Sequence, residues 1–244
     1  MSTFSEVTRL AFTLIAGGEP QFLSIVGRSL AVSATACAIG CTLGCLLGAW
    51  LGVARFRGRG VALAVLHTLL AIPSVLVGLL VYLLLSRSGP LGALGWLFSF
   101  KAMVLAQSLL VVPVAAALTR QLVDDAEQAH GEQLASLGAD PWLRALLLAW
   151  DERYAMLTVL IACFGRAISE VGAVMIVGGN IDGFTRVMTT AIALETSKGD
   201  LPLAVALGVV LLLIVLALNA LVAILRRWRL AHADLPAALG SAQA

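Results

Sequence analysis

The strongest constraint on the fold is a series of long stretches that carry almost no charge. A helix needs about 20 mostly apolar residues to cross a bilayer, and five stretches meet that requirement. They are residues 29–54, 61–86, 102–119, 154–181 and 201–225. In addition, 60% of the 244 residues are hydrophobic and only 12% are charged, whereas a soluble domain is about a quarter charged. We therefore expect an all-α, polytopic membrane protein with five transmembrane helices.

Residues 1–23 precede the first of these stretches and have a different character. Residues 3–16 are too short to cross a bilayer and include Glu6 and Arg9, and Pro20 follows soon after them. The basic start and cleavable apolar core of a signal peptide are not found here. We therefore predict an N-terminal interfacial helix.

Residues 120–153 are a charged interruption between two apolar stretches. Backbone groups and charges need water or protein partners, so this loop cannot face lipid. We expect two short helices in it, because Gly138 is typical of a helix end and Asp140 followed by Pro141 is typical of a helix start. The loop should protrude from a single transmembrane domain of residues 24–225 and contact another protein.

Arginine and lysine residues divide unequally between the two sets of span ends, and this division predicts the orientation. The richer set is Arg55, Arg57, Arg59, Arg120, Arg144, Arg153, Arg226, Arg227 and Arg229, and the opposite set is Arg9, Arg28, Arg87, Lys101, Arg186 and Lys198. Cytoplasmic loops carry the excess of positive charge, so the richer set should be cytoplasmic. The N-terminus is then outside, and residues 226–244 form a cytoplasmic tail. A net charge of +2, scattered over span ends, gives no basic stripe for nucleic acid.

Small residues recur at every fourth position of the first span. They are Ala36, Gly40, Gly44, Gly48 and Gly52. This spacing places them on one helix face, where another helix can approach closely. Cys37, Cys41 and Cys45 form a neighbouring stripe, and the fourth cysteine, Cys163, lies in another span. Three thiols could bind a soft metal, but no histidine or acid accompanies them in that span, so we interpret the stripe as packing and expect no metal site.

Two ionisable residues, Arg166 and Glu170, lie inside the fourth apolar stretch. Residues four apart share a helix face, which predicts an ion pair. Such groups usually face a bundle interior or a water path, so they either line and gate a solute pathway or only neutralise each other. Hydroxyls that follow offer an anion uncharged donors, unless they belong to a solvated outer loop. They are Thr185, Thr189, Thr190, Thr196 and Ser197.

The charged loop contains Glu-Gln-Leu-Ala-Ser-Leu-Gly-Ala, which resembles the signature loop of ABC importer permeases: Glu-Ala-Ala, three residues, then Gly. Glu132 and Gly138 match in identity and spacing, whereas Gln133 and Leu134 replace the two alanines. In that family the loop is a coupling helix that docks on the cytoplasmic ATPase. The resemblance therefore implies an ATPase contact for Glu132, Gln133, Ala135, Gly138, Ala139 and Asp140.

A second stretch, Phe-Gly-Arg-Ala-Ile-Ser-Glu-Val-Gly-Ala at residues 164–173 with Gly-Gly-Asn-Ile at 178–181, resembles the molybdate and tungstate permease group. Residues 78–90 and 189–196 look more like the tungstate branch. The similarity covers roughly residues 24–225 and implies a type I ABC importer permease in a bacterial or archaeal inner membrane. It also implies a second copy of the chain, two ATP-binding cassette subunits and a periplasmic or extracellular oxyanion-binding protein. The candidate path or gate residues are Arg166, Ser169, Glu170 and Gly172.

The expected function is the passage of an oxyanion, most simply tungstate, into the cytoplasm by alternating access. The chain lacks the Gly-x-x-x-x-Gly-Lys-Ser/Thr loop that cradles phosphates, so ATP and Mg²⁺ should be used by the partner ATPase and this chain should bind no cofactor. It is then a transport subunit and not an enzyme. The alternatives are import of molybdate or another small solute, and a secondary transporter or channel, for which His67 and Glu170 are few candidate proton carriers.

Overall fold

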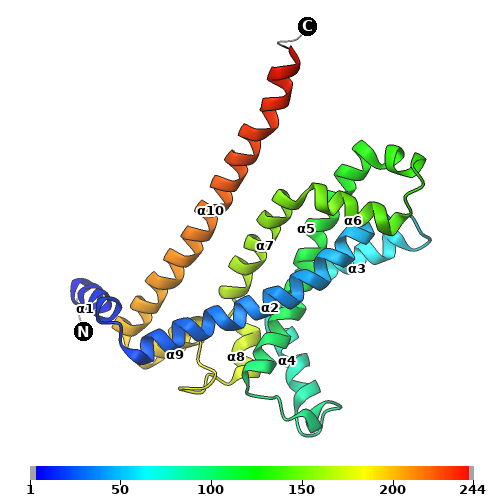
Figure 1. Cartoon of the computed structure of the whole chain (residues 1–244). Coiled ribbons are helices and arrows are strands. Elements are labelled where there is room, and N and C mark those ends of the chain that lie inside the picture. Colours follow the sequence, from blue (N-terminus) through cyan, green and yellow to red (C-terminus); the bar gives the residue numbers. More distant parts are fainter. Residues whose placement is uncertain (1–3, 242–244) are drawn as a thin grey trace.

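The computed structural model describes the backbone of residues 4–241 and the side chains of residues 6–224. Within this range every regular element is helical, which confirms the all-α prediction (Figure 1). The elements are α1 Phe4–Gly17, α2 Pro20–Val53, α3 Arg59–Ala71, α4 Ser74–Leu85, the 3-10 turn η1 Gly92–Leu94, α5 Phe100–Ser136, α6 Pro141–Asp151, α7 Arg153–Ile168, α8 Gly172–Gly178, α9 Met188–Lys198 and α10 Leu201–Ser241. Residues 242–244 of the predicted tail lie outside the described residues.

Among the described residues, three helices are long and apolar enough to cross a membrane alone: α2, α5 and the Leu201–Ile224 part of α10. The stretches predicted as continuous spans at 61–86 and 154–181 are instead two bent pairs, α3 with α4 at 97° and α7 with α8 at 57°. The structure therefore has up to five spans, and reaches five only if each bent pair is one span.

The break between α3 and α4 has a local cause. Pro73 has no backbone N–H and disfavours helical dihedrals in the residue before it. Ile72 is accordingly extended, with φ −64° and ψ 130°. The proline that lies in the middle of the predicted span thus divides it into two shorter helices.

The break between α7 and α8 spans residues 169–171 and contains no proline. Glu170 Oε1 accepts a hydrogen bond of 3.2 Å from Ala173 N. The side chain thus takes the place of a main-chain carbonyl at the start of α8, and the helix begins anew at Gly172.

The most extensive helix contact joins α2 to α5, along the stripe of small residues. A Cβ atom added at Gly48 would lie 2.3 Å from Ala116 O, and one added at Gly44 would lie 2.6 Å from Val112 O. Side chains of any size are excluded at these positions because backbone occupies the space. The predicted close approach is therefore confirmed as packing inside this chain.

Helix α5 continues well beyond the predicted span of residues 102–119. Its 37 residues give a length of about 55 Å, against roughly 30 Å for the hydrocarbon core. Residues 120–136 are therefore the extension of a spanning helix, and the expectation of a separate short helix before Gly138 was wrong. Nothing in this polar, helix-forming sequence interrupts the helix before that glycine.

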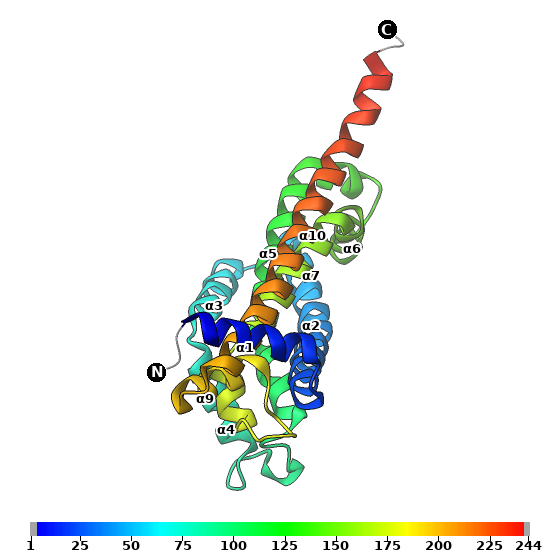
Figure 2. The ribbon, with the colours of Figure 1, turned by 90° about the vertical axis from the view of Figure 1, so that its left-hand side faces the viewer.

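Helices α1 and α10 pack against each other at one end of the molecule, and Figure 2 shows α1 crossing α10. Gly18, at φ +58°, separates α1 from α2. A separate N-terminal helix is thus confirmed, and its interfacial position stays a prediction. Helix α2 starts at Pro20, nine residues before the predicted span, and the predicted tail continues α10 as far as Ser241.

The half-helices α4 and α8 contact each other close to their breaks. A Cβ added at Gly78 would lie 2.7 Å from Ala173 Cα, and one added at Gly172 would lie 2.7 Å from Val75 Cγ2. Val81 and Val174 continue this contact into a buried apolar cluster with α2 and α5. The two broken segments are therefore packed together.

Candidate functional site

The turn between α5 and α6, residues 132–140, is the α5–α6 corner. Helix α5 closes with a hydrogen bond of 3.1 Å from Ala139 N to Leu134 O, and Gly138 has a φ of +83° that favours glycine. Asp140 Oδ1 then accepts a hydrogen bond of 2.6 Å from Leu143 N and caps α6. The predicted helix end and helix start are both confirmed.

The corner presents the residues predicted for the ATPase contact. Glu132, Gln133, Ala135, Gly138 and Asp140 are exposed, and Ala139 is half-buried. The structure brings them together within one turn at the end of a long helix. They are thus accessible to another protein.

An ion pair that the sequence analysis missed fixes α6 to α5. Arg144 Nη1 lies 3.0 Å from Glu127 Oε1, and both side chains are largely buried. Gly131 provides the space for the Glu127 carboxylate, since a Cβ there would lie 2.6 Å from its Cδ. Glu127 and Arg144 lie on different helices, so the three- or four-residue spacing that predicts an ion pair within one helix does not apply to them.

Helix α6 has one buried face and one exposed apolar face. Ala145 and Leu148 pack against α2 and α5 with Val53 and Val123. The exposed apolar side chains are Trp142, Leu143, Leu146, Leu147 and Trp150. Trp150 is 71% exposed. An apolar face beside a polar corner is the kind of surface that a partner protein covers.

The predicted Arg166–Glu170 ion pair is wrong. Helix α7 ends at Ile168, so the two residues do not share a helix face, and no ion pair joins them. Glu170 is buried, with its carboxylate on Ala173 N, whereas Arg166 is exposed and makes no polar contact with any described residue. The four-residue spacing predicts an ion pair only if both residues lie on one unbroken helix.

The candidate gate residues instead gather at the α7–α8 break. The Ser169 hydroxyl donates to Gly165 O at 2.9 Å and lies on an exposed part of the break. Gly172 begins α8 and contacts α4. Together with Arg166 and Glu170, these residues surround the bend between α7 and α8.

Most of the hydroxyls considered for anion contact are used within the fold. Thr185 Oγ1 donates to Gly178 O, and Thr189 Oγ1 donates to Glu170 O at 2.8 Å. Thr190 Oγ1 accepts from Val187 N at the start of α9. All three threonines are buried, so their first role is to hold the loop after α8.

The two predicted sets of cations form networks at opposite ends of α2. Near the C-terminal end of α2, the Asp124 carboxylate lies 3.0 Å from Arg59, 3.7 Å from Arg55 and 3.9 Å from Arg120. These three cations belong to the richer set and face one carboxylate. The structure therefore retains an excess of positive charge at this end.

The second network lies near the start of α2. Arg28 donates to Gly183 O at 2.7 Å and to Arg186 O at 3.1 Å. Arg186 in turn lies 3.2 Å from Asp182 and 3.8 Å from Glu195. Of this poorer set, Arg186 and Lys198 are thus paired with acidic side chains in the loop and helix that follow α8, and Arg28 is bound to main-chain oxygens there.

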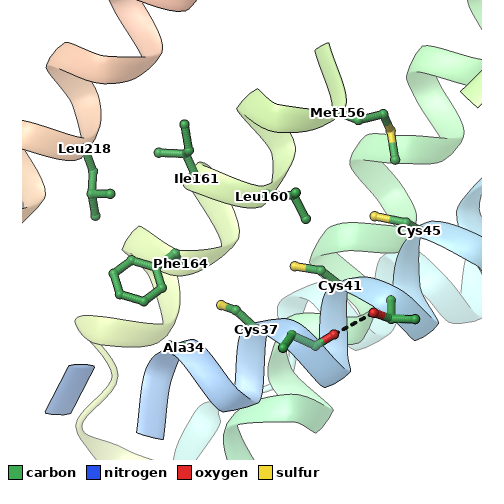
Figure 3. Close-up of a pocket in the computed structure, with 11 residues that line it drawn as sticks. Ala34, Cys37, Cys41, Cys45, Met156, Leu160, Ile161, Phe164 and Leu218 are labelled. Atoms are coloured by element: carbon green, nitrogen blue, oxygen red, sulfur yellow. Dashed lines mark hydrogen bonds between the residues drawn. The ribbon is translucent and has the colours of Figure 1, made fainter. Parts of the chain in front are cut away.

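The cysteines line an apolar cleft of about 650 Å³ between α2, α7 and α10. Figure 3 shows the sulfur atoms of Cys37, Cys41 and Cys45 projecting toward α7, with Leu218 of α10 across the opening. Cys163 is buried in the adjoining cluster. Among residues 6–224, no group of three or more His, Cys, Asp or Glu side chains could hold a metal ion, and the apolar lining does not suit an oxyanion.

No family model matches the sequence, whereas several known proteins do. The chain is 42% identical over 222 residues to the tungstate uptake system permease protein TupB of Peptoclostridium acidaminophilum, covering 91% of this chain and 97% of the relative. It is 43% identical over 204 residues to a probable anion ABC transporter permease protein of Haloferax volcanii, with coverages of 82% and 88%. A TupB of Campylobacter jejuni is 41% identical over 155 residues, with coverages of 64% and 65%. With its membrane-spanning helices, the chain therefore belongs to the permease subunits of ABC-type tungstate and anion uptake systems.

Proposed function

We propose that this chain passes tungstate from an extracytoplasmic binding protein to the cytoplasm in an ATP-driven importer. The observation that carries the proposal is the 42% identity, over almost the whole of both chains, to a tungstate uptake permease. Molybdate or another small oxyanion is the alternative cargo for the same architecture. In this proposal the importer contains two copies of the chain in a bacterial or archaeal cell membrane.

The α5–α6 corner is the proposed contact for a cytoplasmic ATP-binding cassette subunit. Its polar residues are exposed, and the adjacent apolar face of α6 includes Trp142 and Trp150. The Glu127–Arg144 ion pair fixes α6 to α5. A displacement of the α5–α6 corner by the ATPase would therefore be transmitted to α5. The chemistry of ATP and Mg²⁺ belongs to the partner, and this chain supplies the mechanical connection.

Arg166 is the proposed contact for the oxyanion along the path. It is the only charged residue between Tyr154 and Ser169 in the sequence, its side chain is exposed, and no described acidic residue forms an ion pair with it. An unpaired cation at membrane depth must face water or a partner of opposite charge. A passing anion, in the space between two copies of the chain, satisfies that requirement transiently.

Alternating access would follow from the bend beside Arg166. ATP binding would close the partner ATPases and move the α5–α6 corner. The α7–α8 break would then change its angle and open the path outward to the binding protein. ATP hydrolysis would return the complex to the inward state.

The proposal is tested in vesicles that contain the permease, its ATPase and its binding protein. Tungstate should stimulate ATP hydrolysis and accumulate in the lumen, and sulfate at equal concentration should do neither. Arg166→Gln should reduce tungstate uptake to background with the unstimulated ATPase rate unchanged, because the variant lacks the cation. Arg166→Lys and the exposed-site control Arg57→Gln should both keep uptake.

Two results would contradict these expectations separately. If tungstate neither stimulates hydrolysis nor accumulates with the parent complex, the proposed cargo is wrong, and the same assay with molybdate identifies the alternative. If Arg166→Gln transports at the parental rate, Arg166 lies outside the path and the family function remains.

The proposed orientation gives a separate prediction. After replacement of the native cysteines by alanine or serine, a cysteine at Arg57 or His130 should be protected from an impermeant thiol reagent in intact cells. A cysteine at Asp182 or Lys198 should be labelled, because these exposed side chains lie at the opposite end. The readout is the mass shift of the purified permease. If only the cysteines at positions 57 and 130 were labelled, the orientation would be the opposite of the proposed one, and the α5–α6 corner could not contact a cytoplasmic ATPase.

A further inference from the structure

A small polar cavity lies beside the α7–α8 break, enclosed by α2, α5 and the start of α9. Its volume is about 10 Å³, which is the space for one water-sized particle. Its polar lining residues are Ser29, Ser33, Gln107, Glu170 and Thr189. All five are at least nine-tenths buried. Such a concentration of polar groups at membrane depth needs a physical explanation.

Two of the five side chains are already satisfied. Ser29 Oγ donates to Ile25 O at 2.9 Å and accepts from Met188 N at 2.7 Å. Thr189 Oγ1 donates to the main-chain oxygen of Glu170. These bonds fix the walls of the cavity.

Three oxygen atoms around the cavity have no partner among the described residues. Gln107 Nε2 donates to Ala167 O at 2.9 Å, which leaves Gln107 Oε1 buried and unpaired. Glu170 uses Oε1 on Ala173 N, and no bond is formed by its Oε2. The Ser33 hydroxyl likewise has no partner. A carboxylate oxygen, an amide oxygen and a hydroxyl oxygen thus line one space.

The Glu170 carboxylate is also not neutralised by a basic side chain. It is 6% exposed, and the ion pairs of the described residues do not include it. Arg28 and Arg186 are bound to the loop after α8, and Arg166 lies on α7 without an acidic partner. A buried charge without a partner is strongly unfavourable. A proton on the carboxyl group would relieve this cost at one oxygen atom, whereas a bound cation would relieve it and satisfy all three oxygen atoms together.

We infer that the cavity is a binding site for one monovalent cation of the size of Na⁺, held by Glu170, Gln107 and Ser33. A cation satisfies the three oxygens and neutralises the carboxylate together, whereas a water molecule would satisfy the oxygens and leave the charge. Oxygen ligands are those of hard cations. Ca²⁺ needs six to eight oxygens and Mg²⁺ keeps several waters, which a cavity of this size cannot contain.

The site goes beyond the proposed transport of an oxyanion, since it assigns the permease a second, cationic ligand. Its three ligands come from three different parts of the fold: α2, α5 and the break between α7 and α8. A bound cation would therefore tie the bend to the two helices with the closest packing. The bound cation would thereby stabilise one angle between α7 and α8.

The test is the thermal unfolding of the full-length permease in lipid nanodiscs. The unfolding temperature should rise with Na⁺ concentration and saturate, because a ligand that binds only the folded state stabilises it. Choline chloride at the same ionic strength should give no such rise. Neither the ATPase nor tungstate is needed, so failure of this test is distinct from failure of the proposed transport function. An unfolding temperature that is the same in Na⁺ and in choline would overturn the site and leave the cavity to a water molecule or a proton.

Variants locate the site. Glu170→Gln should abolish the response to Na⁺, whereas Glu195→Gln should keep it, because Glu195 is an equally buried carboxylate that Arg186 and Lys198 neutralise. Ser33→Ala removes one ligand and no charge, and it should raise the half-maximal Na⁺ concentration by about tenfold. It serves as the test if Glu170→Gln does not fold. A parental Na⁺ response in both Glu170→Gln and Ser33→Ala would place the cation elsewhere and refute this assignment.

Discussion

Gly48→Leu is expected to eliminate the folded permease. A Cβ at this position would lie 2.3 Å from Ala116 O and 3.0 Å from Ala116 C and Cα. These are main-chain atoms of a helix, so they cannot move aside as the end of a flexible side chain would. Overpacking of a core costs about 1–3 kcal/mol when side chains adjust, and here the two helices must separate. The measurement is the amount of monodisperse permease recovered from detergent-solubilised membranes by size-exclusion chromatography.

The matched control is Gly27→Leu on the same helix. A Cβ at Gly27 meets no atom within 4 Å, and the residue is exposed. This variant gains the same side chain and should be recovered at close to the parental level. Equal recovery of the Gly48 and Gly27 variants would show that α2 and α5 do not depend on this contact.

Gly138→Leu is expected to abolish tungstate uptake and to leave the permease folded in the membrane. No atom lies within 4 Å of the added Cβ, so steric conflict with neighbours is not the cause. The cause is the φ of +83°, in a region that costs a residue with a side chain about 1–2 kcal/mol. The strain is relieved by a change in direction between α5 and α6, which moves the proposed ATPase contact. Uptake and tungstate-stimulated ATP hydrolysis in reconstituted vesicles measure the effect.

Asparagine at the same position separates backbone strain from loss of the glycine itself. Asn adopts positive φ far more readily than leucine, so Gly138→Asn should retain most of the uptake. If the leucine variant couples hydrolysis to uptake like the parent, the corner does not transmit motion. If both variants are equally inactive, the conformation of Gly138 is not the reason.

Features determined by neighbouring residues could be predicted from the sequence. Apolar length predicted the helical spans, and Gly138, Asp140 and Pro141 predicted the α5–α6 turn, because each of these signals acts within a few residues. The continuation of α5 to Ser136 was missed because polarity was taken as the end of the helix. Polarity marks the end of the apolar environment, whereas a helix ends only where its backbone is interrupted.

Features determined by contacts between distant residues could not be predicted. The pairing of Arg166 with Glu170 depended on an unbroken helix, and at the break the Glu170 carboxylate is instead bonded to Ala173. The cavity oxygens come from residues as far apart in sequence as Ser33, Gln107 and Glu170, and no spacing relates them. Pro73, by contrast, is a local signal in the sequence for the first break, because a proline disfavours helical dihedrals in the residue before it.

The packing of α4 against α8 has a consequence for the geometry of the proposed gate. Each half-helix is joined to its longer partner by a single break, at Pro73 or at residues 169–171, and the two halves meet at Gly78, Ala173 and Gly172. The two breaks lie beside the packed pair of α4 and α8, so a line through both breaks defines an axis of rotation for that pair. In the proposed gating motion, α4 and α8 would tilt together about that axis as one rigid body, with their mutual packing kept.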